Sequence, residues 1–333
     1  MTTRRKILGA VSAGAFAPSM VLAPYSAFAQ QPPAKVWRIA FLQSVSGSSS
    51  APRLEALRAG LRDLGYAEGK NLVIETRWAE GRLDRLPELA AELVRLKPDV
   101  LVTSSTPAIE AAKRATGTIP IVMVAAASPV ERGLIASLAR PGGNVTGMTL
   151  MSVDIAGKWL QIARELRPGA SRIGALIDVT TSVGPVLTAL RSTAQRINVH
   201  IIVPPVKEAA DVPGAFEQMR REGAQALIVQ LTPLTYERRA QIVETAAKLR
   251  LPAVYASSEF CDLGGLVSYG PHFIDLFRQS ATYIDKIFRG AKPGDLPVAQ
   301  PTTFEYVVNL KTAKTLGIKL TQSMLIQATR VIE

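Results

Sequence analysis

The sequence predicts an α/β protein of two lobes, each built on a doubly wound parallel sheet, joined by a hinge of several chain segments. First, the chain has 333 residues, of which 47% are apolar and 20% charged, and this suits a globular protein of two domains. Second, short apolar runs alternate with amphipathic stretches, the order of a parallel sheet covered on both faces. Third, the apolar run at 38–44 recurs at 172–178, which indicates two homologous halves.

Residues 1–29 have the layout of a cleaved export signal. Basic residues at 4–6 precede an apolar stretch from Ile7 to Ala23, and a small-residue site, Ala27-Phe28-Ala29, follows. The arginine pair is also typical of a twin-arginine export address. We therefore expect cleavage after about Ala29 and a periplasmic mature protein. An uncleaved membrane anchor is the alternative, although the apolar stretch is short for a spanning helix.

The first half begins with a predicted buried strand at 38–43, followed by an amphipathic helix. Leu54, Leu57 and Leu61 fall on one helical stripe, and Gly65 is a suitable helix end. Strands and helices then alternate: a strand at 72–75, a helix at 83–96, a strand at 100–103, a helix from Pro107 and a strand at 121–124.

The second half repeats this order from 172 onward. It predicts helices at 187–197, 216–221 and 236–249, strands at 201–203, 227–230 and 251–255, and then a strand at 266–269, a helix at 273–288 and a strand at 303–310. If the late elements complete both sheets, the first lobe comprises 36–147 with 270–297, and the second comprises 148–269 with 298–333. Several crossings restrict such lobes to a hinge motion about a cleft.

Composition restricts the chemistry. Cys261 is the only cysteine, and His200 and His272 are the only histidines, so a disulfide framework is excluded and little material remains for a metal centre or catalytic relay. We expect no metal, no cofactor and no enzymatic activity. The net charge is +12, but basic residues such as Arg53 and Arg58 are spread along predicted helices without a recognition motif. We interpret them as a solvated helix surface and expect no nucleic acid partner.

Ligands of open parallel sheets bind beyond the carboxyl ends of the strands, so the turns there form the candidate site. Ser or Thr precedes Pro in the segments 104–107, 128–129 and 230–233, and helix starts of this kind attract a carboxylate. Each is also an ordinary helix cap. Asp178 is a candidate for a ligand ammonium or a cap of its own turn. Glu259 is a second anionic candidate or a solvated loop charge.

Several segments carry a family resemblance. The most specific are Arg140-Pro-Gly-Gly-Asn-Val-Thr-Gly147 and Asn309-Leu-Lys-Thr-Ala-Lys-Thr-Leu-Gly-Ile318, and Leu64-Gly-Tyr-Ala-Glu-Gly-Lys-Asn71 adds to them. Over about 37–318 the chain resembles the periplasmic substrate-binding proteins of ABC transporters of the tryptophan and tyrosine uptake type. The resemblance implies a type I periplasmic-binding-protein fold without catalysis. The pocket positions that it implies are Gln43, Ser44, Ser104, Ser105, Thr106, Ser128, Asp178, Thr180, Thr232, Ser257, Ser258 and Glu259.

The predicted function is the solute-binding component of an ABC importer. A small organic ligand, an aromatic amino acid or another carboxylate, would bind between the lobes and stabilise a closed form. The partners would be an ABC permease and an ATPase on a separate chain, since no Walker motif is present here, and the protein would be a monomer. Two alternatives stay open: a ligand-sensing module for a membrane receptor kinase, and an exported two-domain enzyme.

Overall fold

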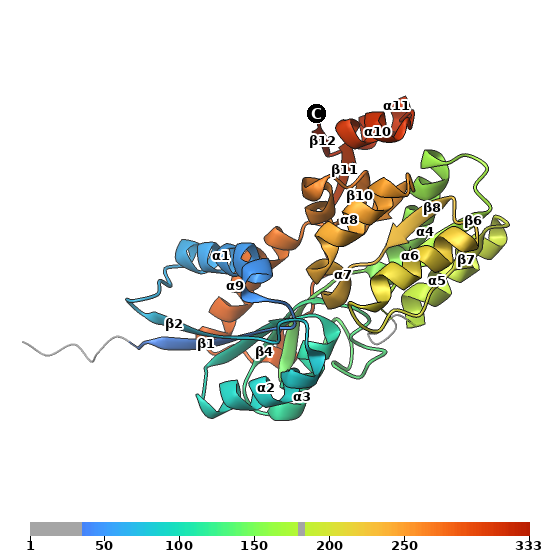
Figure 1. Cartoon of the computed structure of the whole chain (residues 1–333). Coiled ribbons are helices and arrows are strands. Elements are labelled where there is room, and N and C mark those ends of the chain that lie inside the picture. Colours follow the sequence, from blue (N-terminus) through green and yellow to red (C-terminus); the bar gives the residue numbers. More distant parts are fainter. Residues whose placement is uncertain (1–34, 179–183) are drawn as a thin grey trace, which may run out of the picture. The chain divides into compact units, whose positions relative to one another are not determined.

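The structure, a computed structural model, describes residues 35–178 and 184–333 (Figure 1). The predicted export signal and Thr180 therefore lie outside the described residues. In the described part of the chain, no helix is long and apolar enough to cross a membrane. The described strands form two sheets, one of five strands and one of seven.

The five-stranded sheet is entirely parallel, in the order β2-β1-β3-β4-β5. Its strands are β1 (Trp37–Gln43), β2 (Leu72–Trp78), β3 (Val100–Ser104), β4 (Ile121–Ala126) and β5 (Val145–Thr149). Side chains alternate along β1, so that Ile39 and Phe41 join the core on one face while Ala40 and Leu42 join the core on the other. Both faces of this sheet are therefore buried, as in other parallel sheets.

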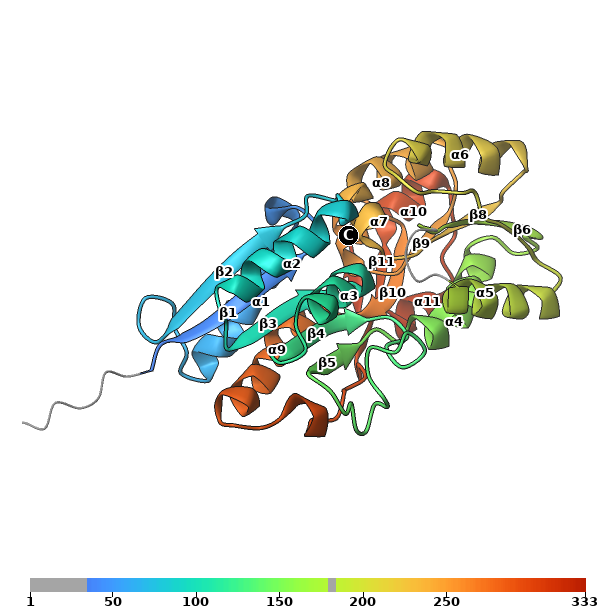
Figure 2. The same ribbon diagram turned by 90° about the horizontal axis from the view of Figure 1, so that it is seen from below.

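Helices cover each face of this sheet (Figure 2). On one face lie α1 (Gly47–Asp63) and α9 (Phe273–Phe288), which pack together although they are far apart in the sequence. On the other face lie η1 (Leu83–Arg85), α2 (Leu86–Arg95) and α3 (Thr106–Ala115). The late helix α9 thus lies with α1 on one face of the first sheet.

The seven-stranded sheet has the order β12-β11-β10-β9-β8-β6-β7. Its strands are β6 (Arg172–Leu176), β7 (His200–Ile202), β8 (Ala226–Val229), β9 (Ala253–Tyr255), β10 (Val267–Pro271), β11 (Phe304–Asn309) and β12 (Arg330–Ile332). β11 is antiparallel to β10, and the other pairs are parallel. The sheet is thus predominantly parallel, as predicted, and the antiparallel pair joins the two strands that precede and follow α9 in the sequence.

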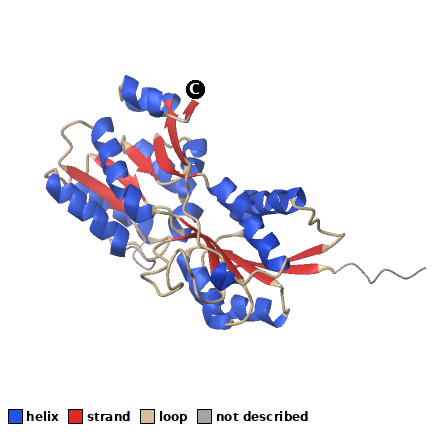
Figure 3. Cartoon of the chain, turned by 180° about the vertical axis from the view of Figure 1, so that it is seen from behind, coloured by secondary structure: helices blue, strands red, loops and turns tan. Residues whose placement is uncertain are grey.

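The second sheet also lies between helices (Figure 3). One face carries α4 (Ser152–Leu166), α5 (Gly184–Arg196), α10 (Leu310–Leu316) and α11 (Gln322–Gln327). The other face carries α6 (Asp211–Arg221), α7 (Pro233–Glu237) and α8 (Arg239–Lys248). Two short 3-10 turns complete the described elements, η2 (Ser258–Leu263) and η3 (Pro293–Asp295).

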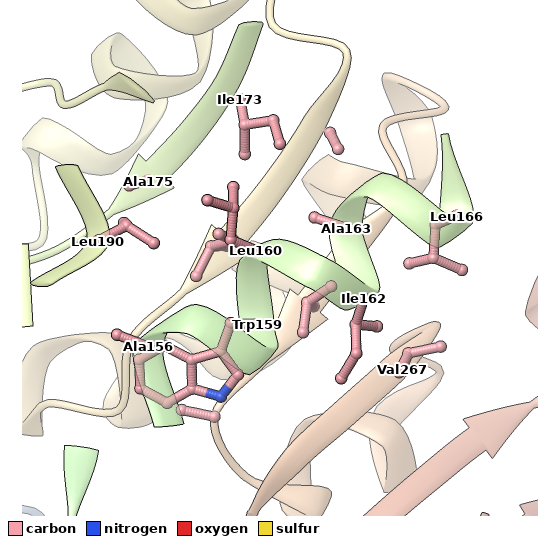
Figure 4. Close-up of a cluster of buried hydrophobic side chains, with 14 of the residues drawn as sticks. Ala156, Trp159, Leu160, Ile162, Ala163, Leu166, Ile173, Ala175, Leu190 and Val267 are labelled. Atoms are coloured by element: carbon pink, nitrogen blue, oxygen red, sulfur yellow. The ribbon is translucent and has the colours of Figure 1, made fainter. Parts of the chain in front are cut away.

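Trp159 anchors α4 on this sheet (Figure 4). Its indole ring is buried, and its Nε1–H donates a hydrogen bond of 2.7 Å to the carbonyl of Tyr269 in β10. Figure 4 shows Trp159 and Leu160 of α4 among core side chains that include Ile173 of β6. The ring thus contributes to the core of this lobe while its polar N–H is satisfied by β10.

The predicted fold class is confirmed: two doubly wound α/β lobes, with chain crossings after β5, after β10 and before β11. The exact segment boundaries of the lobes stay a prediction. The helix expected at 236–249 is two helices, α7 and α8. β5 and α4 were not expected at all. β5 contains Gly147, which has a φ angle of +130°. A Cβ atom at this position would lie 2.0 Å from the Met123 carbonyl oxygen, so only glycine fits here, although glycine is a weak strand former.

Candidate functional site

The carboxyl ends of β1, β3 and β4 meet the turn after β8 around a cavity of about 50 Å³. A second cavity of about 40 Å³ adjoins it and shares the lining residues Ser105 and Thr232. We call the two together the central cavity. Its polar lining comprises Gln43, Ser44, Arg53, Ser104, Ser105, Thr106, Ser152, Gln230, Thr232 and Tyr236.

Six predicted site residues lie at the central cavity: Gln43, Ser44, Ser104, Ser105, Thr106 and Thr232. They come together because the carboxyl ends of parallel strands share one edge of a sheet, and because the turn after β8 approaches that edge from the other lobe. Whether these residues contact a ligand stays a prediction.

Hydrogen bonds and backbone geometry hold this lining in place. The Ser104 hydroxyl donates to Gln43 Oε1 at 2.6 Å, and the hydroxyl oxygens of Ser44 and Ser105 are also 2.6 Å apart. Ser105 and Ala125 adopt positive φ angles of 69° and 63°. Such angles cost a residue other than glycine about 1–3 kcal/mol and gather at ligand sites, where the surrounding structure enforces them.

Three buried polar atoms at the central cavity have no hydrogen-bond partner among the described residues. They are Gln43 Nε2, Arg53 Nε and Gln230 Oε1. Their residues are at most 5% exposed. Because nearly all buried polar groups in folded proteins are satisfied, these three point to a group that is supplied from outside the chain.

Arg53 of α1 is buried, with its side chain 6% exposed, so its interpretation as solvated helix surface is wrong. Its Nη2 lies 3.0 Å from Glu259 Oε2, in η2 of the other lobe. The guanidinium also lies 3.9 Å from the centre of the Tyr236 ring and 5.1 Å from that of Phe273. The Tyr236 hydroxyl donates to Glu259 Oε1 at 2.6 Å. We call Arg53, Tyr236 and Glu259 the cross-lobe cluster.

The cross-lobe cluster has a defined charge state. Burial by itself would raise the pKa of the Glu259 carboxyl, but the Arg53 guanidinium and the Tyr236 hydroxyl outweigh burial and hold that pKa below its ordinary value. Burial raises the pKa of Tyr236 to about 12, so its phenol stays protonated and donates. Glu259 is therefore an ion-pair partner, and its interpretation as a solvated loop charge is wrong.

The start of α1 makes further contacts to α7. The Glu237 carboxylate accepts hydrogen bonds from the Ser46 amide and, at 3.2 Å, from the Ser49 hydroxyl. The Tyr236 hydroxyl lies 3.1 Å from the Ser49 carbonyl oxygen. An anionic side chain at a helix N-terminus is favoured by the helix dipole. The two lobes thus meet through directed polar contacts along the first turns of α1.

Ser128 and Asp178 do not line the central cavity. Ser128, at φ +46, lines a cavity of about 270 Å³ with Met151 and Gln300. Asp178 is buried and lines a cavity of about 570 Å³ with residues 80–84. Ser128 and Asp178 therefore do not share a cavity with Gln43, and their predicted roles in ligand binding stay predictions.

The serines beside Glu259 act locally. The Ser257 hydroxyl bonds Glu259 Oε2 at 3.0 Å and caps the start of η2, while the Ser258 hydroxyl donates to Glu305 at 2.6 Å. Ser257 thus supports the cross-lobe cluster without lining the central cavity, whereas Ser258 points to a different carboxylate.

Sequence reasoning missed Arg53 although a signal was present. Arg53 precedes Leu57 and Leu61 by four and eight positions, so it falls on the same buried stripe of the helix. A charged residue on an apolar stripe predicts either a helix edge or a buried ion pair. Its partner, Glu259, is 206 residues away in the sequence and carries no pattern that identifies it.

Most of the chain is similar to known proteins. The family described as ABC transporter substrate binding protein matches residues 38–332. A tyrosine-binding protein of Clostridioides difficile is 27% identical over 274 residues, which are 80% of this chain and 78% of that protein.

Two solved structures share the fold over nearly the whole chain. A conserved domain protein from Vibrio cholerae is 26% identical, with a TM-score of 0.84 over 89% of this chain and 100% of that one. A protein from Streptococcus pneumonia, solved in complex with L-Trp, is 25% identical, with a TM-score of 0.82 over 90% of this chain and 100% of that one. With its two α/β lobes and a family match that spans almost every described residue, the chain belongs to the ABC transporter substrate-binding proteins, which bind small ligands on the type I periplasmic-binding-protein fold.

Proposed function

We propose that this protein is the solute-binding component of an ABC importer and that it holds a small organic ligand in the central cavity. The observation that carries this proposal is the set of buried, unpartnered polar atoms of Gln43, Arg53 and Gln230 around one cavity. The relatives described as tyrosine-binding and as solved with L-Trp support an aromatic amino acid or another carboxylate as the ligand.

Hinge closure would couple ligand binding to transport. Both lobes contribute to the lining, with Gln43 from the first and Thr232 from the second, so a ligand there would contact both at once. A ligand that contacts both lobes binds the closed form better than the open form and shifts the population toward closure. The cross-lobe cluster adds contacts that exist only when α1 approaches α7 and η2.

Export to the periplasm, removal of residues up to about Ala29, and a monomer that docks on a permease with a separate ATPase complete the proposal. A sensing module would use the same cavity and closure, and it would differ only in the membrane partner. Loss of ligand uptake on deletion of the gene favours transport, whereas retained uptake favours sensing.

The proposal is tested by thermal unfolding of the purified protein with L-tyrosine, L-tryptophan, the other amino acids and simple organic acids. A ligand at 100 times its dissociation constant stabilises the folded protein by about 2.7 kcal/mol, which raises the melting temperature by several degrees. Gln43→Leu removes an amide of the lining, so we expect it to reduce the shift. Gln195→Leu, on the exposed surface of α5, is the matched control. A panel without any shift contradicts the proposal.

A further inference from the structure

We propose that Arg53 is a ligand-binding residue and that its Nε–H, together with the Gln43 Nε2 amide, receives a carboxylate of the ligand. This inference rests on the proposed function, and it names both a residue and a ligand chemistry. The pocket positions implied by the sequence resemblance do not include Arg53.

The first step is the identity of the unpartnered atoms. Arg53 Nε and Gln43 Nε2 are both hydrogen-bond donors, both belong to residues that line the larger part of the central cavity, and both lack a partner. Arg53 is 5% exposed and Gln43 is 0% exposed, so water outside the protein does not satisfy them. Two buried donors beside one cavity require an acceptor, and the group that fits them carries oxygen lone pairs.

The second step is the orientation of Arg53. Its Nη2 is held by Glu259, and its guanidinium lies 3.9 Å from the centre of the Tyr236 ring. A guanidinium is planar and presents its donors in a fixed fork, so these two contacts fix the direction of Nε as well. The Ser104 hydroxyl similarly bonds Gln43 Oε1, which leaves the Nε2 end of that amide for another partner. The two donors are thus positioned before a ligand arrives.

The third step is the charge of the acceptor. Arg53 contacts Glu259 and the Tyr236 ring. The guanidinium of Arg239 lies 4.2 Å from the centre of the same ring. Glu237 is a second carboxylate at this lobe contact, where it accepts from the Ser46 amide, and Arg239 Nη1 donates to the Ser49 hydroxyl at 3.3 Å. A charge-assisted hydrogen bond from a guanidinium to a carboxylate is about twice as strong as a neutral one. A ligand carboxylate therefore forms a stronger hydrogen bond with Arg53 than a neutral carbonyl does.

The same arrangement connects the ligand to lobe closure. Arg53 belongs to the first lobe, and Glu259 and Tyr236 belong to the second, so the guanidinium bridges the ligand and the opposite lobe. A carboxylate on Nε holds Arg53 in the direction that its contact with Glu259 needs. Binding and closure then support one another through a single side chain.

The test compares matched pairs of probes by calorimetric titration: L-tyrosine with L-tyrosinamide, L-tryptophan with L-tryptophanamide, and 3-phenylpropionate with 3-phenylpropionamide. Each pair differs only in whether the acceptor is a carboxylate or a neutral carboxamide. For any pair that binds, we expect the carboxylate to bind at least tenfold more tightly. If none of these probes binds, the same comparison is made between the acid that shifts the melting temperature in the thermal panel and its amide, and the proposed function fails only if no compound of that panel binds. If both members of a binding pair bind equally well, the function stands and the role of Arg53 is overturned.

Variants of Arg53 supply the second readout. Arg53→Lys keeps the charge and a contact with Glu259 but carries all its N–H groups on one nitrogen, which cannot take the places of both Nη2 and Nε, so the carboxylate preference should fall about tenfold. Arg53→Gln with Glu259→Gln removes the ion pair as a unit and guards against a single variant that does not fold. Arg62→Lys on the exposed face of α1 is the control and should bind as the parent does. Unchanged carboxylate affinity in both Arg53 variants overturns the proposal.

Discussion

Two faces of α1 carry arginines of the same chemistry in opposite surroundings. The side chain of Arg53 is 6% exposed and pairs with Glu259 of the other lobe, whereas the side chain of Arg62 is 52% exposed and pairs at 2.8 Å with Glu55 of its own helix. In the exposed pair, the contact between the two charges replaces contacts that each charge would otherwise make with water, so the net gain in stability is small. The buried pair is shielded from water, so each charge is stabilised mainly by its partner and not by hydration.

The contrast teaches that the number and type of charges on a helix do not reveal which ones matter. The basic residues of α1 all fit a solvated surface by composition. Burial between two lobes turns one of them into a structural and ligand-binding group, because a buried charge without its partner is far less stable than an exposed one. Substitutions on the two faces should therefore differ by several kcal/mol in effect.

The largest effect is expected for Arg53→Gln, which leaves the Glu259 carboxylate buried without its cation. We expect a loss of about 3–5 kcal/mol in the free energy of unfolding, measured by urea denaturation. Adding Glu259→Gln removes the orphaned charge and should recover part of the loss. A loss below about 1 kcal/mol in the single variant would show that the two faces of α1 do not differ.

A smaller effect is expected for Tyr236→Phe, which keeps the ring beside Arg53 but removes the hydroxyl that donates to Glu259. A hydrogen bond to a charged group contributes about 1.5–3 kcal/mol, and we expect a loss of this size. Tyr283→Phe is the control, because its hydroxyl bonds backbone groups of Pro297 and Ala299, and it should lose only about 0.5–1.5 kcal/mol. Equal losses in the two variants would contradict a special role for the carboxylate.

Acid provides the next comparison. The pKa of Glu259 is lowered in the folded protein, mainly because Arg53 and Tyr236 outweigh the effect of burial. The stability from this group is therefore complete above the pKa of an unfolded glutamate, about 4.3, and is lost as the pH falls through the lower folded value. Each unit of lowering corresponds to about 1.4 kcal/mol.

The difference between the parent and Glu259→Gln isolates this contribution from the other carboxyl groups. We expect the parent to be more stable than the variant at pH 6 and the difference to shrink by pH 3, as followed by urea denaturation at both values. A difference that stays constant over this range would mean that Glu259 does not titrate with a lowered pKa.

Elements with clear local patterns could be predicted from sequence. The strands β1, β3 and β8 are short apolar runs, and the helix expected at 273–288 has the bounds of α9. Because parallel strands present their carboxyl ends at one edge, the meeting of Gln43, Ser104 and Ser105 was also predictable.

What could not be predicted depends on contacts over long sequence distances. The pair of Arg53 and Glu259 spans 206 residues, and neither side chain carries a local pattern that selects the other. Strand β11 pairs antiparallel with β10, and between these two strands the chain crosses to the first lobe and forms α9 there. Ser128 and Asp178 follow strands as expected, but they line cavities other than the central cavity.

The smallest effect is expected at Arg62, and it gives the comparison its baseline. Arg62 and Glu55 lie on the solvent side of α1 with their side chains about half exposed, so water and salt screen their attraction. Arg62→Gln keeps the helix propensity almost unchanged and removes only this screened pair. We expect the free energy of unfolding to change by no more than about 0.5 kcal/mol at physiological ionic strength, and by still less at 1 M salt. A loss that approaches that of Arg53→Gln would mean that α1 as a whole, not the buried face that meets the second lobe, determines the sensitivity to substitution.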